Sequence, residues 1–271
     1  MAITVIRAAL VAGLTALLVL GAGRAIDVDS TTGDTTAAAA TVVTTAAPTT
    51  PAPTSARAKA PSTNATVGAL FAGASHFCTA SVVHSATGDV VLTAAHCVNG
   101  GAGAGYRSGL SFAPGYHDGT APYGMWTVTS AVVADGWSAS ADPDLDFAFL
   151  TVHQAGNPAA VESVTGANTL GTDRGFTHQI TLTGYPNTTN SPVVCQGVTT
   201  RFDTYQQRIA CAGFPDGTSG GPFVTDTDPS TGRGTVIGVI GGYQLGGDTP
   251  DVSYSAYFDD DIAKLYATVG S

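Results

Sequence analysis

Short apolar segments rich in β-branched and aromatic residues recur along the last three quarters of the chain and predict β-strands. Clusters of Gly, Pro, Asn and Asp separate them, as is typical of turns. The clearest segments are Thr79–Val83, Val90–Thr93, Trp126–Val133, Phe147–Val152, Gln179–Gly184, Pro222–Val224, Thr235–Ile240 and Val252–Tyr257. Because long helical periods are missing between them, the pattern predicts an all-β sandwich or barrel.

One helix is predicted, near the C-terminal end. Asp259-Asp260-Asp261 supplies an N-cap and a negatively charged first turn, both of which favour a helix start. An apolar stripe with helical spacing follows, formed by Ile262, Leu265, Tyr266 and Val269. Such a stripe indicates a helix that packs one face against the strands.

The first 25 residues have the pattern of a signal peptide. Arg7 precedes an uncharged apolar run from Ala8 to Leu20, and small residues lead to Ala25. An uncleaved membrane anchor is the alternative, although the run is short for a membrane span. We therefore expect a secreted protein with no membrane association after cleavage.

Residues 26–66 consist mostly of Thr, Ala, Ser and Pro, and the first aromatic residue of the chain is Phe71. A segment of this composition buries too little apolar surface to offset its chain entropy. We expect a disordered linker or pro-segment at 26–66 and one folded domain at 67–271. A chain that starts near Ala65 is expected to fold.

The predicted domain is acidic, with six Lys and Arg residues against seventeen Asp and Glu residues. This balance disfavours nucleic acids and anionic membranes as partners. Acidity also keeps a secreted protein soluble, and that simpler explanation is sufficient here. Nothing in the composition requires more than a monomer.

The four cysteines are expected to form two disulfides, because export exposes them to an oxidising compartment. Three pairings are possible. We expect Cys78 to pair with Cys97, and Cys195 with Cys211, since each pair closes a loop of fewer than twenty residues. A zinc site is the alternative, but the chain has no Cys-x-x-Cys spacing.

Three separate motifs carry candidate chemistry. Gly217-Thr218-Ser219-Gly220-Gly221-Pro222 is a glycine-rich turn that presents a serine, and Thr93-Ala94-Ala95-His96-Cys97 places a histidine after an apolar run. Between them, Asp146 directly precedes the apolar segment Phe147–Leu150. Histidine, aspartate and serine in this chain order match the order of a chymotrypsin-type triad.

Through these motifs the chain resembles secreted bacterial serine proteases of the trypsin and glutamyl-endopeptidase superfamily. The resemblance implies two six-stranded antiparallel β-barrels with a C-terminal helix. It implies Ser219 as nucleophile, His96 as general base and Asp146 as the residue that orients the histidine. It also implies an oxyanion hole at Gly217 and Ser219, polypeptide substrates, and a mechanism without metal or cofactor.

Several alternatives remain open at this stage. Asp142 and Asp144 compete with Asp146, and the three spaced acids could form a calcium loop, although the glycine and glutamate of an EF-hand are missing. An esterase would use the same triad. A protease-shaped binding protein without turnover is the rival outside the enzymes, although such proteins usually lack a triad member.

The chain departs from the trypsin pattern around the nucleophile. Thr218 stands where animal trypsins have an aspartate that pairs with a newly formed N-terminus, so activation by terminal insertion is not expected in its usual form. Gly241 replaces the serine that commonly supports the catalytic aspartate, and backbone N–H groups near Ala95 and His96 are expected to substitute.

The substrate pocket is the least specific part of the resemblance. Its candidates are Gly213, Gly241, Gly242, Tyr243 and Asp251. Asp251 at the pocket floor would favour cleavage after Arg or Lys, whereas a solvated Asp251 would leave a roomy apolar pocket. The stretch Gly238–Tyr254 contains no histidine, which weighs against a preference for glutamate.

Overall fold

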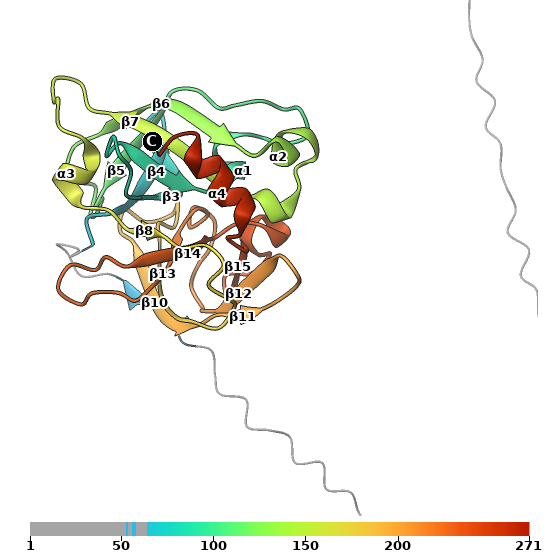
Figure 1. Ribbon diagram of the computed structural model, residues 1–271. Coiled ribbons are helices and arrows are strands. Elements are labelled where there is room, and N and C mark those ends of the chain that lie inside the picture. The colour runs from blue at the N-terminus through green and yellow to red at the C-terminus, as the bar shows by residue number, and fades with distance from the viewer. Residues whose placement is uncertain (1–52, 54–55, 58–63, 271) are drawn as a thin grey trace, which may run out of the picture. The chain divides into compact units, whose positions relative to one another are not determined.

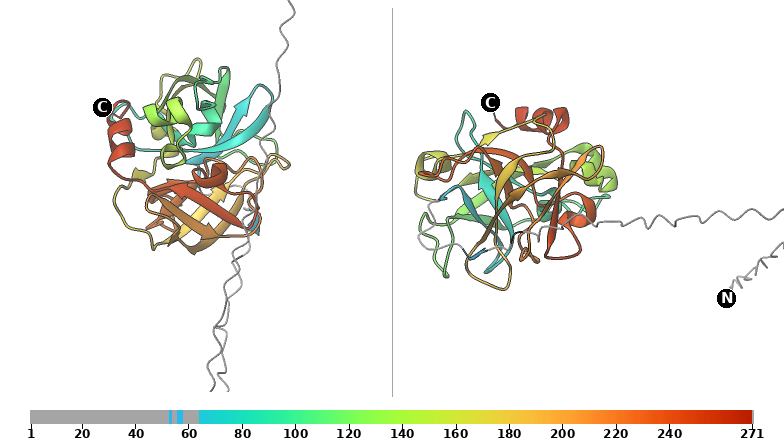
Figure 2. Two further views of the ribbon diagram at one scale, coloured as in Figure 1. Left: turned by 90° about the vertical axis from the view of Figure 1, so that its right-hand side faces the viewer. Right: turned by 90° about the horizontal axis from the view of Figure 1, so that it is seen from below.

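The computed structural model describes residue 53, residues 56–57 and residues 64–270 (Figure 1). The predicted signal peptide and most of the predicted linker therefore lie outside the described residues. The described chain is mainly β-structure in two halves, which lie side by side in Figure 2. Among the described residues, every helix is too short or too polar to cross a membrane.

The first half is a closed six-stranded barrel in the order β2-β3-β4-β7-β6-β5. Its strands are β2 Val67–Ala72, β3 Ser75–Val82, β4 Val90–Thr93, β5 Leu110–Pro114, β6 Trp126–Val133 and β7 Ala148–His153. Large side chains fill its interior, including Leu70, Phe112, Trp126 and Phe149, none of which is exposed. The removal of these apolar side chains from water makes the main stabilising contribution to such a barrel.

The second half contains two sheets. The six-stranded sheet has the order β1-β10-β9-β13-β14-β8, formed by β1 Ala56–Arg57, β8 Thr169–Leu170, β9 Gln179–Gly184, β10 Val193–Val198, β13 Pro222–Thr225 and β14 Thr235–Val239. The three-stranded sheet has the order β11-β12-β15, formed by β11 Thr200–Arg201, β12 Gln206–Ala210 and β15 Val252–Ala256. Leu182, Phe223 and Ile237 contribute to the core of this half.

The all-β fold with a C-terminal helix is confirmed, but the second half is not one closed backbone ladder. No strand ladder joins β14 to β15; directly after β14, Gly241 N donates to the carbonyl of Tyr254 at 3.0 Å, and side chains of β15 and β12 make the other links. Ser255 Oγ accepts a hydrogen bond from Val239 N at 3.0 Å, and Gln207 Nε2 donates to the carbonyl of Ile237 at 2.7 Å. A further departure is that β8 joins β14 in parallel rather than antiparallel.

The helices are short. They are α1 Ala95–Val98, α2 Asp135–Ser140, α3 Val161–Thr165 and α4 Asp260–Ala267, with 3-10 turns η1 Pro143–Leu145 and η2 Tyr243–Gly246. The predicted cap of α4 is present, because the Asp259 side chain accepts from Asp261 N at 2.9 Å. Its apolar face packs on the first half (Figure 1), where Tyr266 lies 5.4 Å from the Phe149 ring.

Strand β1 lies within the segment that composition predicts to be a linker. Ala56 pairs with Val194 and Arg57 with Val193 of β10. The carbonyl of Pro53 also accepts a hydrogen bond from Ala212 N at 3.1 Å. The segment joins the domain through backbone hydrogen bonds at a sheet edge. The pattern of apolar side chains in a sequence does not reveal an interaction of this kind.

A chain that starts at Ala65 should fold but should melt about 2–4 °C below one that starts at Pro53, because for about 200 residues 1 kcal/mol corresponds to a shift of that size. Each lost backbone hydrogen bond contributes about 0.5–1.5 kcal/mol, partly offset by the entropy of ordering the strand. Circular dichroism melts of the two chains test this, and equal melting temperatures would contradict a stabilising role for β1.

Candidate active site

The loop that carries Ser219 is held against the first barrel by Thr79. Thr79 N donates to the carbonyl of Ser219 at 2.7 Å, and Thr79 Oγ1 donates to the carbonyl of Gly217 at 3.1 Å. The same hydroxyl accepts from Tyr185 N at 2.8 Å. Thr79 therefore connects the loop of Ser219 to both halves of the domain, a positioning role that no sequence motif revealed.

Gly217 occupies a position that only glycine can fill. Its φ is +95°, and a Cβ atom there would lie 2.4 Å from Asn187 N. Contact this close with backbone leaves no room for a side chain. The glycine thus allows the chain to turn tightly just before Ser219.

The N–H groups of Gly217 and Ser219 donate no hydrogen bond to any residue that the structure describes. Both residues line the same cavity. Two free donors beside a serine are what an oxyanion hole requires, so the pair expected from the sequence is available for this use.

His96 and Asp146 are in direct contact. His96 Nδ1 lies 2.8 Å from Asp146 Oδ2, and His96 N donates to Asp146 Oδ1 at 2.9 Å. Because a carboxylate only accepts hydrogen bonds, Nδ1 carries the proton and Nε2 is left as an acceptor. His96 lies on α1 directly after β4, and Asp146 lies directly before the strand region of β7.

The carboxylate of Asp146 is fully buried and satisfied by three N–H donors. The third is Gly242 N, which donates to Oδ2 at 2.8 Å. A Cβ atom at Gly241 would lie 3.0 Å from Oδ2. In the resembled proteases, a serine at the position of Gly241 supports the aspartate. Here the backbone N–H groups of His96 and Gly242 support the carboxylate, and the one of His96 was expected from the sequence.

The competing aspartates face elsewhere. Asp144 Oδ1 accepts from Gln206 Nε2 at 2.7 Å, and Asp142 Oδ1 caps η1 by accepting from Asp144 N at 3.0 Å. Neither contacts His96, so the geometry favours Asp146 for the third position.

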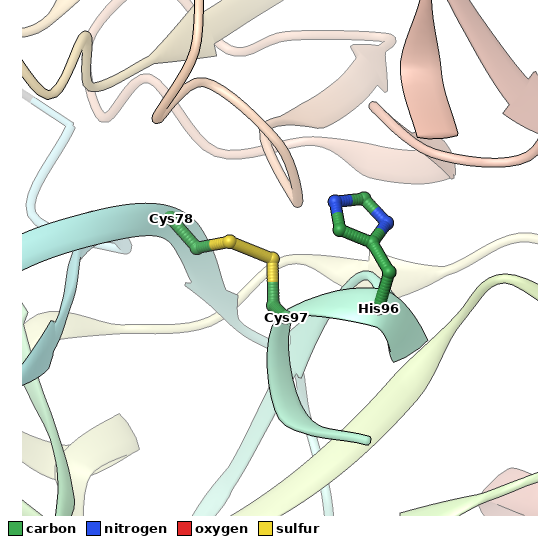
Figure 3. Close-up of side chains that lie close together, drawn as sticks. All are labelled: Cys78, His96 and Cys97. Atoms are coloured by element: carbon green, nitrogen blue, oxygen red, sulfur yellow. A yellow bond between two sulfur atoms is a disulfide. The ribbon is translucent and has the colours of Figure 1, made fainter. Parts of the chain in front are cut away.

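A disulfide joins Cys78 of β3 to Cys97 of α1 beside the His96 ring (Figure 3). The second disulfide joins Cys195 to Cys211, so both pairs are those expected from the sequence. All four cysteines are oxidised. The close group Cys78, His96 and Cys97 therefore offers no thiolate to a metal ion, which removes the zinc alternative.

Ser219 and His96 line one cavity of about 670 Å³. Among the described residues, no hydrogen bond joins the two side chains. Hydrogen bonds of this kind are often long or poorly aligned before substrate binds. Phe214, Ile240 and Leu245 form apolar parts of the wall. Its charged residues are Arg107, Asp216 and Asp248.

None of the five pocket candidates from the sequence lines this cavity. Gly241 and Gly242 lie against Asp146 instead. Gly213 N donates to the carbonyl of Pro250 at 2.8 Å, and Tyr243 packs on Phe202 at 4.8 Å.

Asp251 in particular is exposed and lies outside the wall. It occupies the turn before β15, where its carbonyl accepts from Cys211 N at 2.9 Å. The backbone is thereby tied to Cys211, while the side chain faces solvent. The residues that sequence reasoning missed include Phe77, Arg107, Asn187, Thr188 and the stretch 244–248.

Comparison with known proteins places this geometry in context. The family model described as Trypsin matches residues 53–258. A search of curated proteins found no match. Among solved structures, the protease Anisep from Arthrobacter nicotinovorans is 27% identical over 79% of this chain and 98% of its own, with a TM-score of 0.68.

Two further structures are similar. A thermostable serine protease, AL20, from an extremophilic microorganism is 25% identical over 76% of this chain and 97% of its own, with a TM-score of 0.68. A Glu endopeptidase is 19% identical over 76% of this chain and 91% of its own, with a TM-score of 0.61. At that identity, the last comparison shows the fold alone.

Proposed function

Because this chain belongs to the trypsin family, we propose that it is a secreted serine endopeptidase that uses Ser219, His96 and Asp146. The observation that carries the proposal is the buried Asp146 carboxylate, which holds the ring of His96 at 2.8 Å beside the cavity that Ser219 lines. The chymotrypsin-like fold and the protease neighbours support a peptidase.

In the proposed reaction, Ser219 Oγ attacks the carbonyl carbon of the scissile peptide bond. Nε2 of His96 takes the hydroxyl proton and then passes it to the leaving amine, so that an acyl-enzyme forms on Ser219. A water molecule, deprotonated by the same nitrogen, hydrolyses the ester. Asp146 stabilises the imidazolium, and the N–H groups of Gly217 and Ser219 stabilise the oxyanion.

We also propose that Thr218 removes the usual requirement for a new N-terminal amine. Its hydroxyl donates to the carbonyl of Pro215 at 2.7 Å and is buried with the loop. A neutral hydroxyl that already has a hydrogen-bond partner in its own loop does not need a cationic partner. Secretion is proposed from the predicted signal peptide, which lies outside the described residues, together with the two disulfides.

The experiment for the proposed function has two steps. Covalent labelling of Ser219 by a fluorophosphonate separates an enzyme from a protease-shaped binding protein. Digestion of a mixed peptide library then separates an endopeptidase from an esterase. Ester hydrolysis without any peptide cleavage would contradict the proposal.

The same library reports specificity, and cuts are expected mainly after Phe, Tyr and Leu. The walls offered by Phe214 and Ile240 are apolar, and burying such a side chain contributes about 1.5–3 kcal/mol, or about 10- to 100-fold in kcat/KM over Ala. Asp216→Asn, Asp248→Asn and Asp251→Ala should leave this preference unchanged. Cuts after Arg or Lys that disappear in one of these variants would show a basic specificity instead.

A further inference from the structure

Arg107 lies at the end of a glycine-rich hairpin and lines the same cavity as His96. The hairpin begins directly after α1 and returns to it, with Arg107 N donating to the carbonyl of Val98 at 2.8 Å and Gly100 N to the carbonyl of Gly105 at 3.0 Å. The two ends of this loop are therefore fixed by backbone hydrogen bonds. The position of Arg107 depends on the helix that carries His96.

The guanidinium of Arg107 stacks on a ring and keeps its charge available. Its Cζ lies 5.4 Å from the centroid of Phe77, within the range of a cation–π contact. The residue is exposed, and it forms no ion pair with any carboxylate in the described part of the chain. Among the described residues, it is the only Lys or Arg in the cavity wall.

The charges of the cavity wall are divided between the two halves of the domain. Asp216 and Asp248 come from the second half, whereas Arg107 and Phe77 come from the first. The apolar walls proposed to hold the acyl side of the substrate, Phe214 and Ile240, also belong to the second half. With the acyl side of the substrate assigned to the second half, the part of the wall that the first half contributes, with Phe77 and Arg107, is left for the leaving-group side.

We infer that Arg107 is a specificity-determining residue that binds a carboxylate on the leaving-group side of the substrate. The inference rests on the proposed function. A planar guanidinium stacked on a ring is well suited to a carboxylate, which it can bind through two parallel hydrogen bonds. The carboxylate has two possible sources, an Asp or Glu side chain just after the scissile bond or the terminal carboxylate of a short leaving peptide.

Quenched fluorescent peptides with one acyl sequence test the inference. They carry Asp, Ala or Lys at the first two positions after the scissile bond, and each is made with a free or an amidated C-terminus. We expect the wild-type kcat/KM for the Asp peptide to exceed that for the Ala peptide about fivefold, as for a partly exposed ion pair. In Arg107→Gln the ratio should fall to about one, and Arg107→Glu should favour the Lys peptide.

Arg201→Gln is the matched control. Arg201 also stacks on a ring, at 5.0 Å from the Phe176 centroid, but it does not line the cavity. This variant should keep the wild-type ratio. If the preference depends on a free C-terminus rather than on the Asp side chain, the terminal carboxylate is the ligand. Loss of that preference in Arg107→Gln would still support the inference.

The two proposals fail in different ways. Hydrolysis of the Ala peptide by the wild-type enzyme tests the proposed function, and its absence would overturn both. Normal hydrolysis with equal rates on the Asp and Ala peptides, or a ratio that Arg107→Gln and Arg107→Glu leave unchanged, would overturn only the role of Arg107.

Discussion

Replacing Ser219 by alanine is expected to lower kcat on the order of 10⁶-fold, because the reaction loses the atom that attacks the carbonyl. His96→Ala should cost a similar factor, since no other described group is placed to take the serine proton. The double variant should be little worse than either single variant, because the two side chains act as one unit. Residual activity would come from the oxyanion donors and from substrate binding.

Matched variants distinguish this loss from unfolding. Ser130 and His153 are exposed residues of the first barrel, far in sequence from the nucleophile loop. Ser130→Ala and His153→Ala should keep full activity and the wild-type melting temperature. Steady-state kinetics with thermal melts of all the variants provide the measurement. A Ser219→Ala enzyme that folds and still cleaves peptides at more than a few per cent of the wild-type rate would exclude Ser219 as nucleophile.

Asp146→Asn should lower kcat by about 10⁴-fold, mainly because the histidine is left in the wrong tautomer. The geometry adds a second cost. Both carboxylate oxygens accept from N–H groups, namely His96 N on one side and His96 Nδ1 with Gly242 N on the other. An asparagine has only one acceptor oxygen, so its NH₂ group must face at least one of these donors.

Asp144→Asn is the control for that prediction. Asp144 lies two residues away, and its Oδ1 contacts Gln206 rather than His96. This variant should change kcat/KM by no more than about threefold, as expected for a partly exposed polar contact of about 0.5 kcal/mol. A crippling effect of Asp144→Asn with a mild effect of Asp146→Asn would show that the third position of the triad had been assigned to the wrong residue.

Local signals in the sequence were sufficient for the candidate catalytic residues. The turn around Ser219 and the strand that follows Asp146 are encoded by neighbouring residues, and chain order led us to expect the contact between His96 and Asp146 that the structure has. Their catalytic role stays a prediction. The same applies to α4, whose cap and apolar stripe are both local, and to the disulfides, whose loops are short.

Local pattern was less informative for strands with few β-branched residues. Strand β12, Gln206–Ala210, has the sequence Gln-Gln-Arg-Ile-Ala, and β5 ends in proline. Neither pattern predicts a strand, because the sheets impose extended backbone on residues with little preference for it. Strand β1 is a further case, since only its backbone pairing with β10 adds it to the domain.

By itself, then, the sequence determined the all-β class, the C-terminal helix, the disulfide pairs and the residues proposed for the chemistry. Only the tertiary structure decided the cavity wall, since it is assembled from loops that are distant in the chain, such as those of Phe77, Arg107 and Phe214. It also showed that Asp251 is exposed and does not line this cavity. Side chains within a motif are oriented by their own backbone, whereas a cavity depends on how separate loops pack, and no short segment contains that information.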